Sequence, residues 1–454
     1  MNRNTDDLST QNFQKRHARH FRLAKTGLWG LVDQGLSSIT NLSLSVIIAR
    51  TSTPSDFGAY SLAFVAYTIT MGIVVNTSTI PITIRHGAES LDKFRIQLRT
   101  AVSTGAGLGL ISGLLLVGVG LLFNSSVRGY LLLFGVMMPF LMLQAVWRFI
   151  YFALRDPKIA ALCDGVWALF QTIAFAVLIL RGDKDPFLFA LSWGAAAAIA
   201  GLLFSLKLKV WPQIHTFVSH LREYRKLTPN LVGEFLALSG VNQSLPYVLA
   251  GVLGVTAVAA FKAGQLELGL LNIPLQGLGP LALVYGIREY EKGAQQLRSL
   301  LRLCVYGGGV AIVLFGLSIS LFVPTNLMRH LVGPNASTAH PLILPLTFML
   351  LGNWIAFVAF VGLRARADVR ITFVLQAIIS VLLLAACIAG SILGHVFGAC
   401  WAMAAAYIIG SGGAWIFHAL RLRHAEQMRI VGQRVHEQGL KVPTGAVELE
   451  NERE

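Results

Sequence analysis

The feature of this sequence that most constrains its fold is a series of near-continuous apolar blocks of about 20 residues each. At a rise of about 1.5 Å per residue, an α-helix of that length crosses the roughly 30 Å hydrocarbon core of a bilayer. Backbone groups find no water in that core, so a spanning segment must satisfy its hydrogen bonds internally. Only 13% of the 454 residues are charged, about half the usual share of a soluble domain. The sequence therefore predicts an all-α polytopic membrane protein.

About twelve such blocks can be placed along the chain. The predicted spans are residues 27–49, 58–80, 100–123, 130–153, 160–180, 186–206, 230–253, 256–286, 303–323, 341–362, 371–393 and 397–420. Two junctions are very short, at Gly254–Val255 and at Gly394–His395, and each is either a hairpin turn or a break within a longer segment. The segment before the first block is polar and basic, and no small-residue cleavage site follows a short apolar core, so we interpret this block as an uncleaved first helix.

The distribution of Lys and Arg orients these spans. If both ends of the chain are cytoplasmic, all but six of the 37 Lys and Arg residues fall in cytoplasmic segments. The exceptions are Arg50, Arg128, Arg181, Lys184, Arg329 and, inside a span, Lys262. A miscounted helix would reverse the alternation from that point onward, so the bias supports the count. It also accounts for the net charge of +15 without nucleic acid as a partner, because basic loops face anionic lipids of the cytoplasmic leaflet.

The longest internal polar stretch divides the predicted spans six and six. We expect a cytoplasmic N-terminal segment (1–26), an N-terminal six-helix bundle (27–206), a cytoplasmic linker (207–229), a C-terminal six-helix bundle (230–420) and a cytoplasmic tail (421–454) whose composition predicts disorder. The halves are weakly alike at an offset near 202 residues, through a true repeat or through chance likeness of apolar sequence. A true repeat would set the halves parallel, with the transport site between them near the midplane.

Polar side chains form a stripe along the first predicted span. They are Asp33, Gln34, Ser37, Asn41 and Ser45, which cluster within about 120° at roughly 100° per residue. Charged groups at membrane depth are costly and usually face a water-filled cavity or one another. The stripe is therefore either the wall of a cavity or a set of helix–helix hydrogen bonds.

The eighth predicted span carries a second polar face. Its members are Lys262, Gln265, Asn272 and Gln276, and Pro274 is expected to kink the helix between the last two. Lys262 lies about two turns from the outer end, which is too deep for its ammonium to reach the interface easily. It is either a cation that awaits an anionic substrate or the partner of a carboxylate on a neighbouring helix.

Arg148 and Asp164 lie at similar depth near the cytoplasmic ends of the fourth and fifth spans. We expect them to form an ion pair, with a role in substrate entry as the alternative. The four cysteines lie inside apolar blocks without metal-ligand spacing, and the chain contains no phosphate-binding loop or zinc-protease motif. The sequence predicts no enzyme activity, no cofactor and no metal site.

Several motifs carry a family resemblance. They are Leu31–Asn41, Ala49–Arg50, Ser55–Tyr60, Arg148–Arg155, Pro157–Lys158, Ala263–Gln265, Asn272–Leu278 and Val332–Pro334. In order and spacing they resemble the motifs of bacterial Wzx-type polysaccharide flippases, which belong to the multidrug/oligosaccharidyl-lipid/polysaccharide exporter superfamily. The likeness covers most of residues 27–420.

This resemblance implies two six-helix bundles around a V-shaped central cavity. It also implies a substrate made of a sugar chain on a polyprenyl diphosphate, moved across the bacterial inner membrane and engaged by cations that line the cavity. This chain differs from the richly cationic cavity that the resemblance implies, because Lys262 is the one cation deep within a predicted span. Arg148 and basic residues at the rim of the cavity are further candidates for contact with the diphosphate. The polar side chains of both stripes, Asp33 and Asn41 among them, are the remaining candidates for substrate contact.

The leading hypothesis is a flippase of lipid-linked oligosaccharide in exopolysaccharide or O-antigen synthesis. Its expected partners are that lipid, the surrounding membrane lipids, and the glycosyltransferases and polymerase of the same pathway. The first alternative is an ion-coupled drug or metabolite antiporter of the same superfamily, with Asp33 as a proton or sodium site. The second is a polysaccharide polymerase or ligase. Such enzymes usually carry a large outer loop, and the longest predicted outer loop here, residues 324–340, is short, which argues against this alternative.

The predicted topology can be tested by cysteine labelling in intact cells. In a cysteine-free background, a membrane-impermeant reagent should label a cysteine at position 335 and leave one at position 215 unlabelled, because these positions are assigned to opposite sides of the membrane. Labelling at 215 without labelling at 335 would overturn the assignment.

Overall fold

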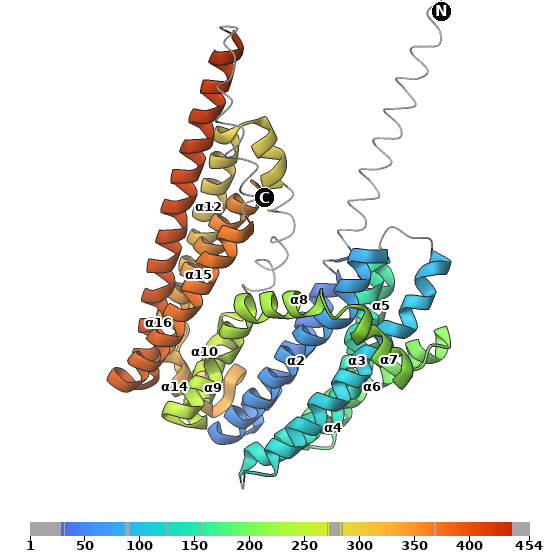
Figure 1. The fold of residues 1–454 in the computed structure, drawn as a ribbon. Helices are drawn as coiled ribbons and strands as arrows, with labels where there is room; N and C mark the ends of the chain where they lie inside the picture. Colours follow the sequence, from blue (N-terminus) through green and yellow to red (C-terminus); the bar gives the residue numbers. More distant parts are fainter. Residues whose placement is uncertain are drawn as a thin grey trace, which may run out of the picture.

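The computed structural model describes residues 29–30, 32–86, 91–123, 125–154, 156–269, 271, 282, 285–366 and 369–437. The regular structure of these residues is helical (Figure 1). A first helix over residues 32–51 is followed by α2 (Pro54–His86), α3 (Leu91–Gly120), α4 (Ser126–Ala153), α5 (Pro157–Leu180), α6 (Pro186–Leu208), α7 (Ile214–Glu223), α8 (Thr228–Phe235), η1 (Leu236–Gly240), α9 (Val241–Leu253), α10 (Val255–Glu267), α12 (Ala294–Phe322), α13 (Thr325–Val332), η2 (Gly333–Asn335), α14 (Ala336–Ala339), η3 (His340–Leu342), α15 (Ile343–Arg364) and α16 (Val369–Glu437).

The predicted all-α membrane fold is confirmed in its helices and in its shortest turns. Eight of the described helices are long and apolar enough to cross a membrane. One of them, α16, holds two predicted spans, because Gly394 (φ −151°, ψ 29°) and His395 (φ 51°, ψ −146°) leave the helical region. Gly254 (φ 87°, ψ 173°) separates α9 from α10 in the same way. Both short junctions are therefore turns between consecutive helices.

Two sequence predictions need correction. The single span predicted at 230–253 is interrupted by η1, one turn of π-helix between α8 and α9. The predicted disordered tail begins as helix, since α16 continues to Glu437. The predicted linker, residues 207–229, also contains a helix that was not predicted, α7.

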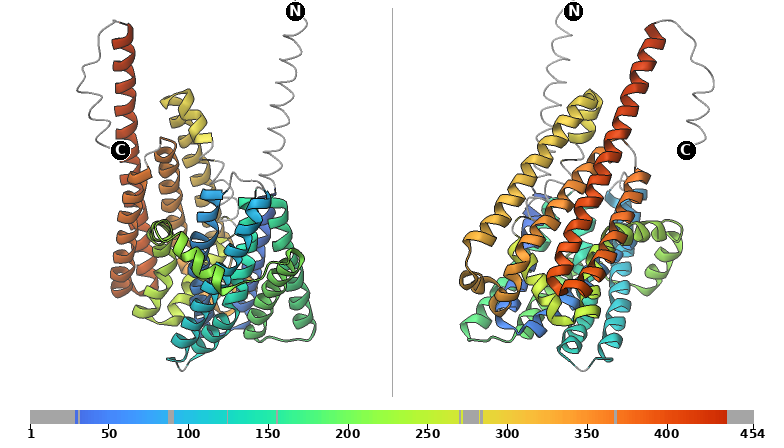
Figure 2. Two further views of the ribbon diagram at one scale, coloured as in Figure 1. Left: turned by 45° about the vertical axis from the view of Figure 1, so that its right-hand side comes forward. Right: turned by 90° about the vertical axis from the view of Figure 1, so that its left-hand side faces the viewer.

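The helices pack in two groups (Figure 1). In the first group, α4 lies at the centre and contacts α2, α3, α5 and α6. In the second, α15 contacts α12 and α16, and α16 also contacts α9. Figure 2 shows that α12 and the C-terminal part of α16 extend beyond the first group at the end of the molecule opposite α14. The division of the chain into two membrane domains at 207–229 stays a prediction.

The two groups meet closely at the end predicted to lie outside. The side chain of Asn335, which is fully buried, donates a hydrogen bond of 3.1 Å from Nδ2 to the carbonyl of Ala49 at the end of the first helix. Gly333, at φ 59°, lies so close to Ala49 that a Cβ atom there would approach the same carbonyl within 2.7 Å. Close backbone approach between the groups thus depends on small residues at this end.

A second close approach joins α2 to α10. A Cβ atom on Gly58 would lie 2.1 Å from the carbonyl oxygen of Val255, which is far below van der Waals contact. Further along α2, the hydroxyl of Tyr247 donates to the carbonyl of Leu62 at 2.8 Å. The packing of α2 against α9, which runs antiparallel to it, and against α10, which runs in the same direction, is therefore the main seam between the groups.

We predict that Gly58→Ala destabilises the protein by about 1–3 kcal/mol, because the new methyl group meets a backbone carbonyl that cannot rotate away. Gly118→Ala is the matched control, since no atom lies within 4 Å of a Cβ at that position. Within a helix, alanine loses less backbone entropy on folding than glycine does, so the control should be neutral or more stable by about 0.5–1 kcal/mol. Thermal unfolding of the purified variants in one detergent measures both, and equal midpoints would contradict the close approach.

Candidate functional site

A buried ion cluster connects the first helix, α4 and α5. Arg148 on α4 donates from Nη2 and Nε to Oδ2 of Asp33 at 2.7 and 2.9 Å. Its Nη1 donates to the hydroxyl of Ser37, one turn further along the first helix, at 3.1 Å. Asp33 is fully buried, and Arg148 is 9% exposed. The guanidinium is thus held in a fixed orientation by planar, charge-assisted bonds.

The predicted pair of Arg148 and Asp164 is confirmed as part of this cluster. Arg148 Nε lies 3.2 Å from Oδ2 of Asp164 on α5, and Oδ1 of Asp164 accepts a hydrogen bond of 2.7 Å from Gln144. The closer partner, Asp33, was not predicted as part of the pair. The sequence feature that could have predicted this contact is that Asp33 lies at the same depth as Arg148, on the polar side of the first predicted span.

The cluster contains two carboxylates and one guanidinium. Its members are almost fully buried, and no second cation contacts the acids among the described residues. One negative charge in this group therefore lacks a compensating ion, although Gln144 and Ser37 supply polar partners. Such an arrangement provides a place where a proton can be bound or released.

The rest of the polar stripe on the first helix makes helix–helix hydrogen bonds. Oε1 of Gln34 accepts from Nη2 of Arg148 at 3.3 Å, and Ser45 shares a hydrogen bond of 3.1 Å with the hydroxyl of Tyr60 on α2. Asp33 has no exposed surface, so it does not line a water-filled cavity in this conformation. Asn41 differs from these residues, because its Oδ1 has no hydrogen-bond partner among the described residues. For most of the stripe, the hydrogen-bonding alternative is therefore the correct one.

Lys262 occupies a different environment on α10. It is partly buried, and neither an ion pair nor a hydrogen bond of its ammonium is found among the described residues. Val255 precedes it by seven residues and so lies within about 20° on the same side of the helix. A Cβ atom on Gly58 of α2 would lie 2.7 Å from the side chain of Val255, so this side of α10 faces the first group.

Two other members of the predicted polar face cannot be placed. Gln265, which is partly buried, lies about 60° from Lys262 around the helix. Asn272 and Gln276 lie outside the described residues, as does Pro274. The structure therefore joins Lys262 and Gln265 on the side that faces the first group, and it brings neither of them into contact with the Arg148 cluster.

One acidic residue was not predicted as a site residue. Glu267 on α10 is 4% exposed, and among the described residues neither of its carboxylate oxygens has a hydrogen-bond partner. Its projection about 140° from Lys262 around the helix excludes an ion pair between the two within α10. An acid in the middle of an apolar block was the signal that could have drawn attention to it.

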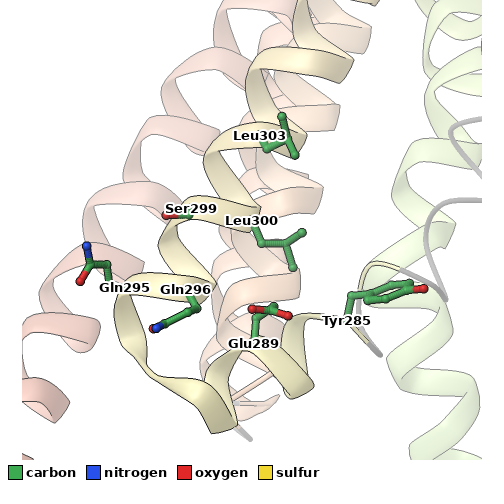
Figure 3. Close-up of a pocket in the computed structure, with 7 residues that line it drawn as sticks. All are labelled: Tyr285, Glu289, Gln295, Gln296, Ser299, Leu300 and Leu303. Carbon is green, nitrogen blue, oxygen red and sulfur yellow. The ribbon is translucent and has the colours of Figure 1, made fainter.

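A shallow pocket of about 520 Å³ lies at the start of α12 (Figure 3). It is lined by Tyr285, Glu289, Gln295, Gln296, Ser299, Leu300 and Leu303. Figure 3 shows that these side chains come from α12 and from the short helical segment that precedes it. None of the predicted substrate-contacting residues lines this pocket, and it lies away from the Arg148 cluster.

Comparison with solved structures decides the fold. A multidrug resistance MATE family transporter of the MOP superfamily in its inward-facing conformation matches with a TM-score of 0.66 and 13% identity, over 87% of this chain and 96% of that chain. The outward-facing conformation of such a transporter matches with a TM-score of 0.58 and 13% identity, over 89% and 96%. This chain has their fold.

A third solved structure also matches. A MOP superfamily transporter from Pyrococcus furiosus Vc1 (DSM3638), whose pocket is described as having reverse polarity, matches with a TM-score of 0.56 and 12% identity, over 88% of this chain and 95% of that one. No family model and no curated protein matches the sequence. At 12–13% identity, these solved structures show the fold of this chain.

We predict an order of stability among charge variants of the cluster. Arg148→Met leaves two buried acids without their cation and should cost about 3–5 kcal/mol. Asp164→Asn should cost less, because it leaves Asp33 and Arg148 as a balanced pair. The triple variant Arg148→Met/Asp33→Asn/Asp164→Asn should recover most of the loss. Abundance in the membrane and thermal unfolding measure this order, and a triple variant no better than Arg148→Met would disprove the electrostatic account.

Proposed function

We propose that this protein is an exporter of lipid-linked oligosaccharide, which moves a polyprenyl-diphosphate-linked sugar chain between the leaflets of a bacterial inner membrane. The fold shared with MOP superfamily transporters supports transport. The resemblance of the sequence motifs to Wzx-type flippases supports this class of substrate. The alternative, a drug or metabolite antiporter, shares the fold and differs in the charge of its cargo.

The observation that carries the proposal is the unpaired ammonium of Lys262. An isolated cation inside a membrane bundle is costly unless an anion or water accompanies it. Lys262 has no carboxylate partner among the described residues, and it faces the other group of helices. A diphosphate that enters between the groups would lose hydration there and would gain this cation in return. Gln265 on the same side offers an amide for hydrogen bonds with sugar hydroxyls or phosphate oxygens.

The Arg148 cluster is less suited to binding a diphosphate directly. Its guanidinium already bonds Asp33, Ser37 and Asp164, so an incoming phosphate would have to displace carboxylates. The predicted contribution of Arg148 to substrate recognition would then require a second conformation. In the conformation described, its bonds hold three helices together.

One specific observation favours the antiporter. The cluster has one more carboxylate than cations, and the matched inward- and outward-facing structures are described as multidrug resistance transporters. A cationic drug would be exchanged for a proton taken up at Asp33 or Asp164. In that case Lys262 would oppose binding of the cargo rather than assist it.

Surface polysaccharide and dye efflux in the same cells separate the two functions. At matched expression, Lys262→Ala should abolish polysaccharide export, Lys262→Arg should retain part of it, and Asp33→Asn should do less harm. Lys292→Ala is the matched control, because it removes an exposed lysine that bonds only Glu289 on the same short segment. Full export by Lys262→Ala, together with loss of efflux of a cationic dye in Asp33→Asn, would reject the flippase and favour the antiporter.

A further inference from the structure

The helix α7, in the predicted linker, is divided into three sectors by its side chains. One sector packs on the protein: His220 is fully buried, and Phe217 lies 3.0 Å from a Cβ position on Gly107 of α3. The second sector is apolar and exposed, with Ile214 83% and Val218 49% exposed. The third is polar and exposed and includes Arg222.

Helical geometry gives the order of these sectors. Taking Ile214 as zero, Val218 lies at about 40° and Leu221 at about −20°, between the protein-facing side near −100° and Arg222 near 80°. Trp211, which is 45% exposed, lies three residues before the helix begins. The apolar sector therefore lies between the body of the protein and a basic rim, which is the pattern of a helix at a membrane surface.

Directional contacts fix the rotation of α7. His220 Nε2 and the carbonyl of Thr77 on α2 are 2.7 Å apart, and burial lowers the pKa of His220, so the neutral ring donates this bond. At the start of the helix and on the same protein-facing side, Ser103 of α3 accepts from the backbone N–H of Gln213 at 2.9 Å and bonds the hydroxyl of Thr216 at 2.6 Å. The apolar sector cannot turn inward without breaking these bonds.

The same contacts give the depth of α7. Thr77 and Ser103 each lie three residues inside the predicted cytoplasmic ends of their spans, at 80 and 100. At about 1.5 Å per residue, this places α7 within roughly 5 Å of the edge of the hydrocarbon core. Amphipathic helices bind bilayers at this boundary, with the apolar side in the acyl region and basic residues at the headgroups.

The charge of the linker selects the kind of lipid. Its basic residues are Lys207, Lys209, Arg222, Arg225 and Lys226, all exposed or partly exposed. Its one acid, Glu223, pairs with Arg85 on α2 at 3.4 Å, which offsets the acid's charge. We propose that α7 is a surface-binding helix for anionic phospholipids of the cytoplasmic leaflet, with Ile214 and Val218 in the acyl region and Arg222, Arg225 and Lys226 at the phosphates.

Quenching by brominated lipid tails tests the insertion. Val218→Cys and Ser219→Cys, each in a background with the four native cysteines replaced by alanine, would carry an environment-sensitive fluorophore. In vesicles of phosphatidylcholine with ~30% phosphatidylglycerol, position 218 should be quenched at least about twofold more than position 219, which faces water, because insertion is limited to the apolar sector. Equal quenching at the two positions would overturn the proposal.

Hydrogen exchange on the unmodified chain tests the lipid charge independently of the labelled variants. Amides of α7 should exchange about tenfold more slowly in bilayers that contain phosphatidylglycerol than in phosphatidylcholine alone. Arg222→Gln/Arg225→Gln/Lys226→Gln should remove this difference. The control Arg128→Gln/Arg181→Gln/Lys184→Gln removes three exposed charges elsewhere and should retain it. Exchange that does not depend on lipid charge, as expected if α7 instead docks a partner protein, would overturn the proposal.

Discussion

The packing of the first group of helices depends on the ion pairs of one buried guanidinium, that of Arg148. Arg148 is buried among apolar helices, where an unpaired charge would be costly, and Asp33 and Asp164 compensate it from two different helices. These bonds fix the rotation of the first helix, α4 and α5 together. Next to it on α4, the indole of Trp147 donates to Ser205 of α6 at 2.9 Å, which brings a fourth helix into the same arrangement. The first group therefore has little freedom to rearrange internally.

The second group is not built around such a cluster in its described part. At the weak offset between the halves, Arg148 corresponds to Leu350, and Tyr60, a buried core residue, corresponds to Lys262. The second group instead carries two ionisable side chains, Lys262 and Glu267, for which the described residues offer no partner, on one short helix. The charges of the first group's cluster hold helices together, whereas those of α10 make no such bond within the described part of the chain. This difference is the reason why the proposed substrate contacts are on the second group.

The sequence predicted what depends on length and local pattern. Block length and charge bias placed the spans, and the glycines at 254 and 394 marked true turns. The ion pair of Arg148 with Asp164 followed from equal depth on consecutive helices. The shorter bond to Asp33 did not, because no local pattern shows which side of the first helix faces α4 across 115 residues. The helix α7 was missed because its apolar side is narrow and its basic side resembles a solvated linker.

The contrast between the cluster and the seam indicates how the molecule can move. Within the first group, separating Arg148 from its acids would expose buried charges to hydrocarbon, which no small ligand could offset. Between the groups, the bonds from Asn335 to Ala49 and from Tyr247 to Leu62 are neutral, and such bonds contribute about 1 kcal/mol each. The close approaches at Gly58 and Gly333 are to backbone carbonyls, and these contacts can separate without leaving an unpaired charge. If access to the site alternates between the two sides of the membrane, we therefore expect the two groups to separate at the end predicted to lie outside. Each group should move as a unit, with the Arg148 cluster intact.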